Sequence, residues 1–199
     1  MKKAVSKLFL CAIPWVGIDI RAADIYVESH FIEGTKNYPA VNPGLMKIIS
    51  KAESGGSPNT LSTLAYPEQA QRLLESFNQT GIVFKVAAYD SKRYIFSIYP
   101  TSSQVENVFQ RFAQVGIDSY DIGLMQVNSR NAKRNGWDEV RLFNDVVYNI
   151  EKSAKLLNDC LNGSASIESS IECYNKGSQK RYSYSYYKRI FAIASNRNK

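Results

Sequence analysis

The chain has 199 residues, a formal net charge of +7, and 44% hydrophobic and 22% charged residues. This length fits one domain, or one domain that carries an insertion, and the composition argues against a disordered or a collagen-like chain. No apolar stretch reaches the roughly 20 residues that a membrane-spanning helix needs. Residues 1–22 hold four basic residues and one acidic residue, so their removal lowers the net charge to +4. Nucleic acid is therefore not an expected partner.

The amino end is typical of an export signal. Three lysines within the first seven residues precede an apolar run over residues 8–18, and the small residues Ala22 and Ala23 offer cleavage points. A proline and a tryptophan interrupt the run, so an uncleaved membrane anchor remains the alternative. We expect residues 1–23 to be a signal peptide, residues 24–199 to form one exported domain without a membrane span, and the location to be periplasmic.

Export would leave two cysteines, Cys160 and Cys173, and two interpretations stay open for them. An oxidising compartment favours a disulfide, whereas the alternative is a pair of buried thiols. His30 is the only histidine, so a zinc site, a Cys–His pair and a Ser–His–Asp triad all lack their parts. No metal or cofactor is expected, and any chemistry must depend on carboxylates, hydroxyls and amides.

The first clear helix follows an irregular segment over residues 24–41. Asn42 is a good N-cap, and Pro43 stands in the first helical position, where its missing N–H costs nothing. Gly55 and the glycine after it end the helix. Its apolar residues have the spacing of a core-facing stripe and are Leu45, Ile48, Ile49 and Ala52.

Residues 62–116 form a distinct block with the order helix, strand, strand, helix. The first helix begins at Pro67, and the second follows a capping box at Thr101 and Gln104. Between these helices, residues 82–88 and 93–99 predict two strands around a turn. The sequence therefore predicts a compact insertion.

Helices account for most of the remaining chain. Residues 118–128 predict a glycine-containing turn that runs into a short helix. We then expect a helix capped by Asn144 that reaches Leu161, a helix that starts at Ser164 or Ser166, and a last helix over residues 183–195. The inward positions expected for the last helix are Tyr187, Ile190, Phe191 and Ala194. The predicted fold class is mainly α with a small β-ribbon (α+β).

Glu53 is the strongest candidate for an acid catalyst. It follows the last apolar residue of its helix and lies at the helix C-terminus, where the dipole disfavours negative charge. Partial burial and the dipole both raise the pKa of a carboxyl group, as a general acid requires near neutral pH. The alternative is a solvated glutamate at a helix end.

Three segments, residues 52–58, 120–129 and 173–177, carry motifs that resemble those of the soluble lytic transglycosylase family, in particular its small members from conjugation, secretion and pilus systems. Residues 52–58 (Ala-Glu-Ser-Gly-Gly-Ser-Pro) resemble the Glu–Ser signature. Residues 120–129 (Tyr-Asp-Ile-Gly-Leu-Met-Gln-Val-Asn-Ser) are similar to the second motif, Gly-Leu-Met-Gln-Ile-Asn, with one change from Ile to Val. Residues 173–177 (Cys-Tyr-Asn-Lys-Gly) resemble the third, Ala-Tyr-Asn-Ala-Gly. Between them, residues 137–161 resemble the run of Trp, Asp/Asn and Asn–Ile that leads into a long helix.

The resemblance implies a lysozyme-like fold and cleavage of peptidoglycan between N-acetylmuramic acid and N-acetylglucosamine. Glu53 would protonate the leaving oxygen and then, as a base, take a proton from the muramoyl 6-hydroxyl to give a 1,6-anhydro product. Because the substrate supplies its own nucleophile, one carboxylate would suffice where glycosidases usually need two.

The same resemblance implies a set of substrate-binding residues. These are Ser54, Gly123, Met125, Gln126, Tyr174 and Asn175. Alternatives stay open for several of them, because Gln126 and Asn175 also suit helix capping and Met125 also suits the core. Asp121 is either a second carboxylate, which would favour hydrolysis, or a capping residue.

The sequence departs from the family in three places. One is the tail, whose tyrosines would either stack on sugars or pack within a helix; they are Tyr182, Tyr184, Tyr186 and Tyr187. The insertion over residues 62–116 replaces a much shorter segment, and it would either shape the glycan groove or dock a partner. Lys176 adds a charge to the third motif. The resemblance implies peptidoglycan as the substrate and proteins of a secretion or conjugation apparatus as further partners. The rival functions are a hydrolysing muramidase of the same fold and a non-catalytic peptidoglycan-binding assembly factor.

Overall fold

The computed structural model describes residues 28–177, 179 and 181–196, so the expected signal peptide lies outside the described residues. In chain order the elements are α1 (Glu28–Thr35), α2 (Pro43–Ser54), β1 (Leu61–Ala65), α3 (Pro67–Asn78), β2 (Val83–Ala88), β3 (Tyr94–Tyr99), α4 (Val105–Gln114), β4 (Tyr120–Ile122), β5 (Val127–Asn128), α5 (Ser129–Asn135), α6 (Glu139–Asn144), α7 (Val146–Gly163), α8 (Ile167–Lys176) and α9 (Ser185–Ser195).

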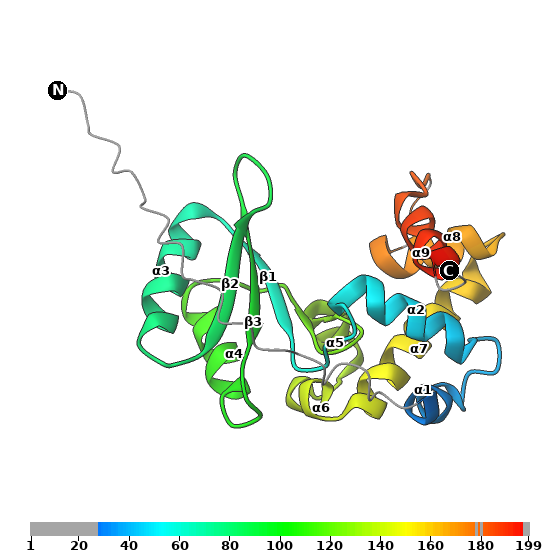
Figure 1. Cartoon of the computed structure of the whole chain (residues 1–199), viewed down its shortest axis with the longest axis horizontal. Helices are drawn as coiled ribbons and strands as arrows, with labels where there is room; N and C mark the ends of the chain where they lie inside the picture. Colours follow the sequence, from blue (N-terminus) through cyan, green and yellow to red (C-terminus); the bar gives the residue numbers. More distant parts are fainter. Residues whose placement is uncertain (1–27, 178, 180, 197–199) are drawn as a thin grey trace.

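The elements form two lobes (Figure 1). One lobe contains the sheet with α3 and α4, and the other contains α1, α2, α7, α8 and α9. The long helix α7 is the centre of the helical lobe, because α1, α6 and α8 all pack against it. The predicted class of a mainly helical protein with a small β component is confirmed, and the architecture is that of a lysozyme-like fold.

Local sequence explains how α2 begins and ends. The Asn42 side chain accepts a hydrogen bond from the Leu45 N–H at 3.2 Å, as the N-cap prediction requires. Gly55 then takes a left-handed conformation with a φ of 67°, which ends the helix directly after Glu53 and Ser54. The turn therefore leaves Glu53 on the last turn of a well-packed helix.

The sheet contains five antiparallel strands in the order β2-β3-β1-β4-β5, and so extends beyond the predicted two-stranded ribbon. β1 was missed because it is short and its partners are distant in sequence: Leu61 pairs with both Ile98 and Ile122. β4 and β5 lie within the segment expected to be a turn. The insertion is thus continuous, through β1, with the strands of the second motif.

Aromatic packing also joins the insertion to the second motif. The ring of Tyr120 on β4 lies 5.2 Å from that of Phe109 and 4.8 Å from that of Phe112, measured between centroids, and both phenylalanines belong to α4. On the same face of the sheet, the Phe77 ring of α3 lies 5.5 Å from the Phe84 ring of β2. α3 and α4 therefore cover one face of the sheet.

Three other expectations were wrong in detail. Residues 28–35 are helical although the segment 24–41 was expected to be irregular; α1 gains its stability from packing on α7 and not from local propensity. The N-cap of α7 is Asp145, and Asn144 instead ends the short helix α6. On α9, Phe191 is 61% exposed, whereas Tyr186 is buried together with Ile190. The apolar stripe of α9 is therefore shifted by one residue.

Gly34 allows α1 to approach α7 closely. A methyl group at this position would lie 2.6 Å from Cγ2 of Ile150, which is far inside van der Waals contact. We therefore expect Gly34→Ala to lower the free energy of unfolding by about 1–3 kcal/mol, the usual cost of overpacking. Urea unfolding measures this change.

Gly163 supplies the matched control, since it lies in α7 with no atom within 4 Å of the added methyl group. Gly163→Ala should leave stability unchanged or raise it by up to about 1 kcal/mol. Equal stabilities of the two variants would contradict the close packing of α1 on α7.

Candidate active site

Glu53 lies where the last turn of α2 meets α9. The Tyr186 hydroxyl donates a hydrogen bond to Oε1 of Glu53, and the Arg189 guanidinium donates one to the carbonyl oxygen of Ala52. Tyr186 and Arg189 are three positions apart on α9, so one face of that helix makes both contacts. The sequence indicated Tyr186 only as one of several tail tyrosines; its bond to Glu53 was missed, because the inward stripe of α9 was expected one residue later.

Burial raises the pKa of Glu53 above its usual value. The hydrogen bond from Tyr186 favours the charged form and lowers the pKa, the nearby charge of Asp121 raises it, and Arg189 lowers it. The net direction is upward, because loss of water around the carboxylate outweighs the partners that stabilise it. A carboxyl group in this state can deliver a proton at a pH where an exposed glutamate is ionised.

Asp121 on β4 is a second carboxylate beside Glu53. Burial raises its pKa, while the hydrogen bond from Asn128 and the neighbouring Ser62 hydroxyl lower it. The Asn128 amide donates to Oδ1 of Asp121 at 2.8 Å, across the antiparallel pair formed by β4 and β5. Asp121 therefore has a fixed position beside the candidate acid.

Both carboxylates line a cavity of about 590 Å³, which we call the Glu53 cavity. This volume lies within the usual range for ligand-binding sites. Of the residues predicted to bind substrate, four line this cavity: Met125, Gln126, Tyr174 and Asn175. The structure thus brings parts of all three motifs to one site.

Ser54 and Gly123 are not among the residues that line the Glu53 cavity. The Ser54 hydroxyl donates to the carbonyl oxygen of Leu124 at 2.7 Å and to that of Ser50 at 3.2 Å. Ser54 therefore ties the end of α2 to the second motif. Substrate contact by either residue stays a prediction.

A glycine is required at position 123 both by the backbone conformation and by the atoms that lie close to it. Its φ is 74°, and an added methyl group would lie 2.7 Å from Nδ2 of Asn149 and 2.9 Å from the Leu142 carbonyl oxygen. Asn149, buried in α7, accepts from the Met125 N–H at 2.8 Å and donates to the carbonyl oxygens of Ile122 and Leu142. Asn149 thus clamps the second motif against the helical lobe.

Gln126 has a positive φ of 48°, which is rare for a residue other than glycine and is often found at functional sites. Its side-chain amide donates to the carbonyl oxygens of Gly123 at 2.7 Å and Thr60 at 3.1 Å, and it accepts from the Ser62 hydroxyl at 2.6 Å. Both N–H donors are therefore used within the protein. Gln126 shapes the wall of the cavity and leaves at most an oxygen lone pair for a ligand.

Glu172 fixes the position of α9. Its side chain is fully buried, and it accepts hydrogen bonds from Lys176 Nζ at 2.9 Å and from the Tyr187 N–H at 2.8 Å. Burial alone would raise the pKa of Glu172, but Lys176 and the N–H groups at the start of α9 lower it below its usual value. The lysine that departs from the third motif thus pairs with a buried carboxylate that holds the helix of Tyr186.

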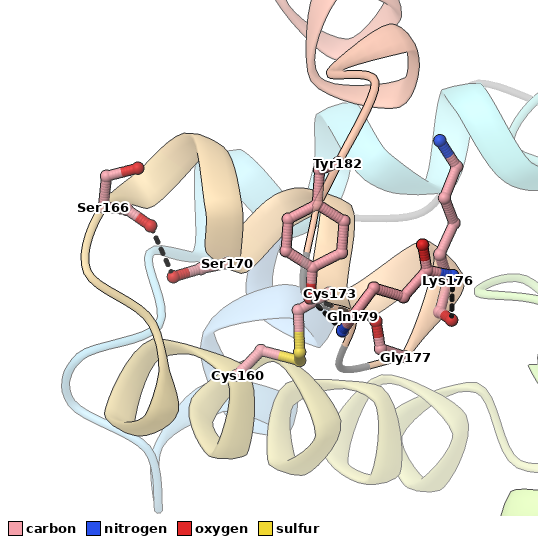
Figure 2. The surroundings of a disulfide bond; sticks show 8 residues. All are labelled: Cys160, Ser166, Ser170, Cys173, Lys176, Gly177, Gln179 and Tyr182. Carbon is pink, nitrogen blue, oxygen red and sulfur yellow. Dashed lines mark hydrogen bonds between the residues drawn. A yellow bond between two sulfur atoms is a disulfide. The ribbon is translucent and has the colours of Figure 1, made fainter.

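Cys160 and Cys173 are joined by a disulfide that links α7 to α8 (Figure 2). Their Cα atoms lie 5.8 Å apart, and both residues line the Glu53 cavity. Beside the bridge, the Tyr182 hydroxyl donates to the Gly177 carbonyl oxygen at 3.1 Å (Figure 2). The bridge holds α8, and with it Tyr174 and Asn175, against α7. In the chain-entropy model a closed loop of this size stabilises by about 3 kcal/mol.

Tyr174 on α8 also lines the Glu53 cavity. Its hydroxyl donates to the Met125 carbonyl oxygen at 3.3 Å. Burial, and then the charge of Glu53, raise the pKa of Tyr174, so it stays a neutral hydrogen-bond donor at any working pH.

Within the part of the chain that the structure describes, no cluster of three His, Cys, Asp or Glu side chains is arranged to hold a metal ion. None of the described helices combines the length and apolar character that crossing a membrane requires.

The fold and this site define a protein of the lysozyme-like class, in which a carboxyl group stands in a groove between a helical lobe and a sheet. Residues 29–194 match the model of the transglycosylase SLT domain, and the chain belongs to this family. The family acts on peptidoglycan as lytic transglycosylases. Neither a curated protein nor a solved structure matches the chain significantly.

The charges around Glu53 predict opposite pH effects for two substitutions. Asp121→Asn removes a charge that raises the pKa of Glu53, so the alkaline limb of the pH–activity profile should move to lower pH. Tyr186→Phe removes a hydrogen bond that lowers this pKa, so the limb should move to higher pH. Measuring kcat/KM for peptidoglycan against pH checks both directions. Shifts of the same sign in the two variants would show that Glu53 does not control the limb.

Proposed function

We propose that this protein is a periplasmic lytic transglycosylase that cleaves the bond between N-acetylmuramic acid and N-acetylglucosamine and leaves a 1,6-anhydromuramoyl end. One observation carries the proposal: a partly buried carboxyl group of raised pKa, Glu53, faces a cavity lined by the second and third family motifs. Family membership supports peptidoglycan as the substrate.

In the proposed reaction Glu53 acts first as an acid. The neutral carboxyl group protonates the glycosidic oxygen, and the bond from that oxygen to the muramoyl C1 breaks. The carboxylate then takes the proton of the muramoyl 6-hydroxyl as O6 bonds to C1, so no water enters the product. The Tyr186 hydrogen bond supports this exchange, because it stabilises the carboxylate between the two proton transfers and keeps its orientation.

The surrounding residues have positioning roles in this proposal. Asn175 is exposed and lines the cavity, and its side-chain amide can donate hydrogen bonds to, or accept them from, an acetamido or hydroxyl group. Tyr174 supplies an apolar ring face for a sugar, whereas Met125 lines the cavity but is only 1% exposed and belongs to the core. Gln126, Ser54 and Gly123 act mainly by holding the second motif, since their hydrogen bonds or close contacts are made within the protein.

A hydrolysing muramidase is the second candidate, and Asp121 is the observation that favours it. Asp121 lines the Glu53 cavity and could activate a water molecule as a base. The hydrogen bond that it accepts from the Asn128 amide, however, holds it within the sheet. Burial raises its pKa, which would strengthen it as a base, so the products of the reaction must distinguish the two candidates.

The setting of the reaction is also part of the proposal. A signal peptide over residues 1–23 would deliver the protein to the periplasm, where the Cys160–Cys173 bridge is stable. Local opening of the wall there would serve a conjugation, secretion or pilus apparatus. This assignment rests on the resemblance to small family members.

Digestion of purified sacculi tests the proposal. We expect the wild-type protein to release muropeptides with anhydro ends, identified by mass spectrometry, and Glu53→Gln to be slower by about 10²–10⁴-fold, the usual contribution of a general acid. Gln keeps the shape of the side chain and can accept from Tyr186, so it serves as a folded control, checked by thermal unfolding.

Other products would decide against the transglycosylase. Muropeptides with reducing ends would establish the muramidase. Binding to sacculi without release of either product would establish a wall-binding assembly factor.

A further inference from the structure

One face of the sheet is left uncovered beside the Glu53 cavity. Alternate residues of a strand point to opposite faces, and α3 and α4 occupy the side of Phe84 and Tyr120. On the other side, Ser62 of β1 pairs with Ser97 of β3 and with Asp121 of β4. All three residues are partly exposed. A polar row therefore leads from the catalytic region on to the insertion.

A second cavity of about 590 Å³ lies on this face, and we call it the sheet cavity. Leu64 and Ile95, a directly paired couple, form part of its floor. The two cavities share three lining residues, which are Asp121, Asn128 and Arg130. They are therefore neighbouring parts of one groove that passes beside Asp121.

The far rim of the sheet cavity carries two exposed tyrosines from the insertion. Tyr66 precedes α3 and is 57% exposed, and Tyr89 belongs to the β2–β3 turn and is 55% exposed. The Arg93 guanidinium lies 5.1 Å from the centre of the Tyr89 ring and holds the turn through an ion pair with Asp90 at 2.7 Å. Tyrosine offers an apolar ring face and a polar hydroxyl, which match the two kinds of surface on a sugar ring.

The charges of this cavity do not suit a polyanion. Arg93 pairs with Asp90, and Arg130 pairs with Asp118 at 3.0 Å. Asp118 and Asp121 add two carboxylates to the lining. A neutral, hydroxyl-rich chain therefore fits the lining better than a nucleic acid does.

We propose that the sheet cavity, built by the insertion, holds the continuation of the glycan strand that is cleaved at Glu53, with Tyr66 and Tyr89 as stacking platforms for its sugars. This inference rests on the proposed function. The insertion then adds sugar subsites to the groove, and the protein favours long strands over short fragments.

Strand-length dependence tests the inference. The double variant Tyr66→Ala/Tyr89→Ala should lose about tenfold in kcat/KM on long, uncrosslinked glycan strands, which corresponds to about 1.4 kcal/mol, and less than twofold on a muramoyl tetrasaccharide. Tyr94→Ala is the matched control, because Tyr94 is an exposed tyrosine of the same hairpin that does not line either cavity. It should behave as wild type on both substrates.

Equal losses on both substrates, or no loss on either, would overturn the inference and leave the proposed function standing. Binding to the long strands is measured in parallel, with each tyrosine change placed in the Glu53→Gln protein. If the Tyr66 and Tyr89 changes weaken binding to long strands while the wild-type protein cleaves no strand, only the proposed function is rejected.

Discussion

The hydrogen bond between Tyr186 and Glu53 is the contact on which the candidate site depends. It joins the end of α2 to α9, two helices separated by most of the chain, and it acts on a carboxyl group that burial has made a weaker acid. Two further constraints hold the helices in place. Glu172 binds the start of α9, and the Cys160–Cys173 bridge fixes α8, which carries Glu172, to α7. The C-terminal part of the chain thus serves to orient one side chain near the start of the fold.

The second motif supplies the opposite wall, and it owes its shape to buried backbone contacts. Asn149 satisfies two backbone groups there and a third on α6, and only a glycine at position 123 allows this approach. The same segment forms β4 and β5, so the turn beside Glu53 is also the edge of the sheet. This shared element explains how an insertion far from the motifs in sequence becomes continuous with the groove.

Much of the fold followed from local signals, whereas the site's supporting contacts did not. Asn42, Pro43 and Gly55 placed α2 correctly, because caps and turns are set by neighbouring residues. α1 and β1 were missed, since their stability comes from pairing with distant partners. The roles of Tyr186 and Glu172 were missed for a related reason: they depend on where α9 crosses α2 and α8. The motifs indicated Glu53, but no spacing along the chain could indicate the hydroxyl group bonded to it.

The proposed activity depends on a folded protein that holds the Glu53 carboxyl group in a weakly acidic state. A ¹³C NMR titration of carboxyl-labelled glutamate measures it directly, with the resonance of Glu53 assigned by its absence in Glu53→Gln. We predict a titration midpoint above the ordinary value of 4.5, because burial outweighs the hydrogen bond from Tyr186. A midpoint at or below 4.5 would contradict the proposed role of Glu53. Such a carboxyl group would be ionised near neutral pH and could not serve as the acid.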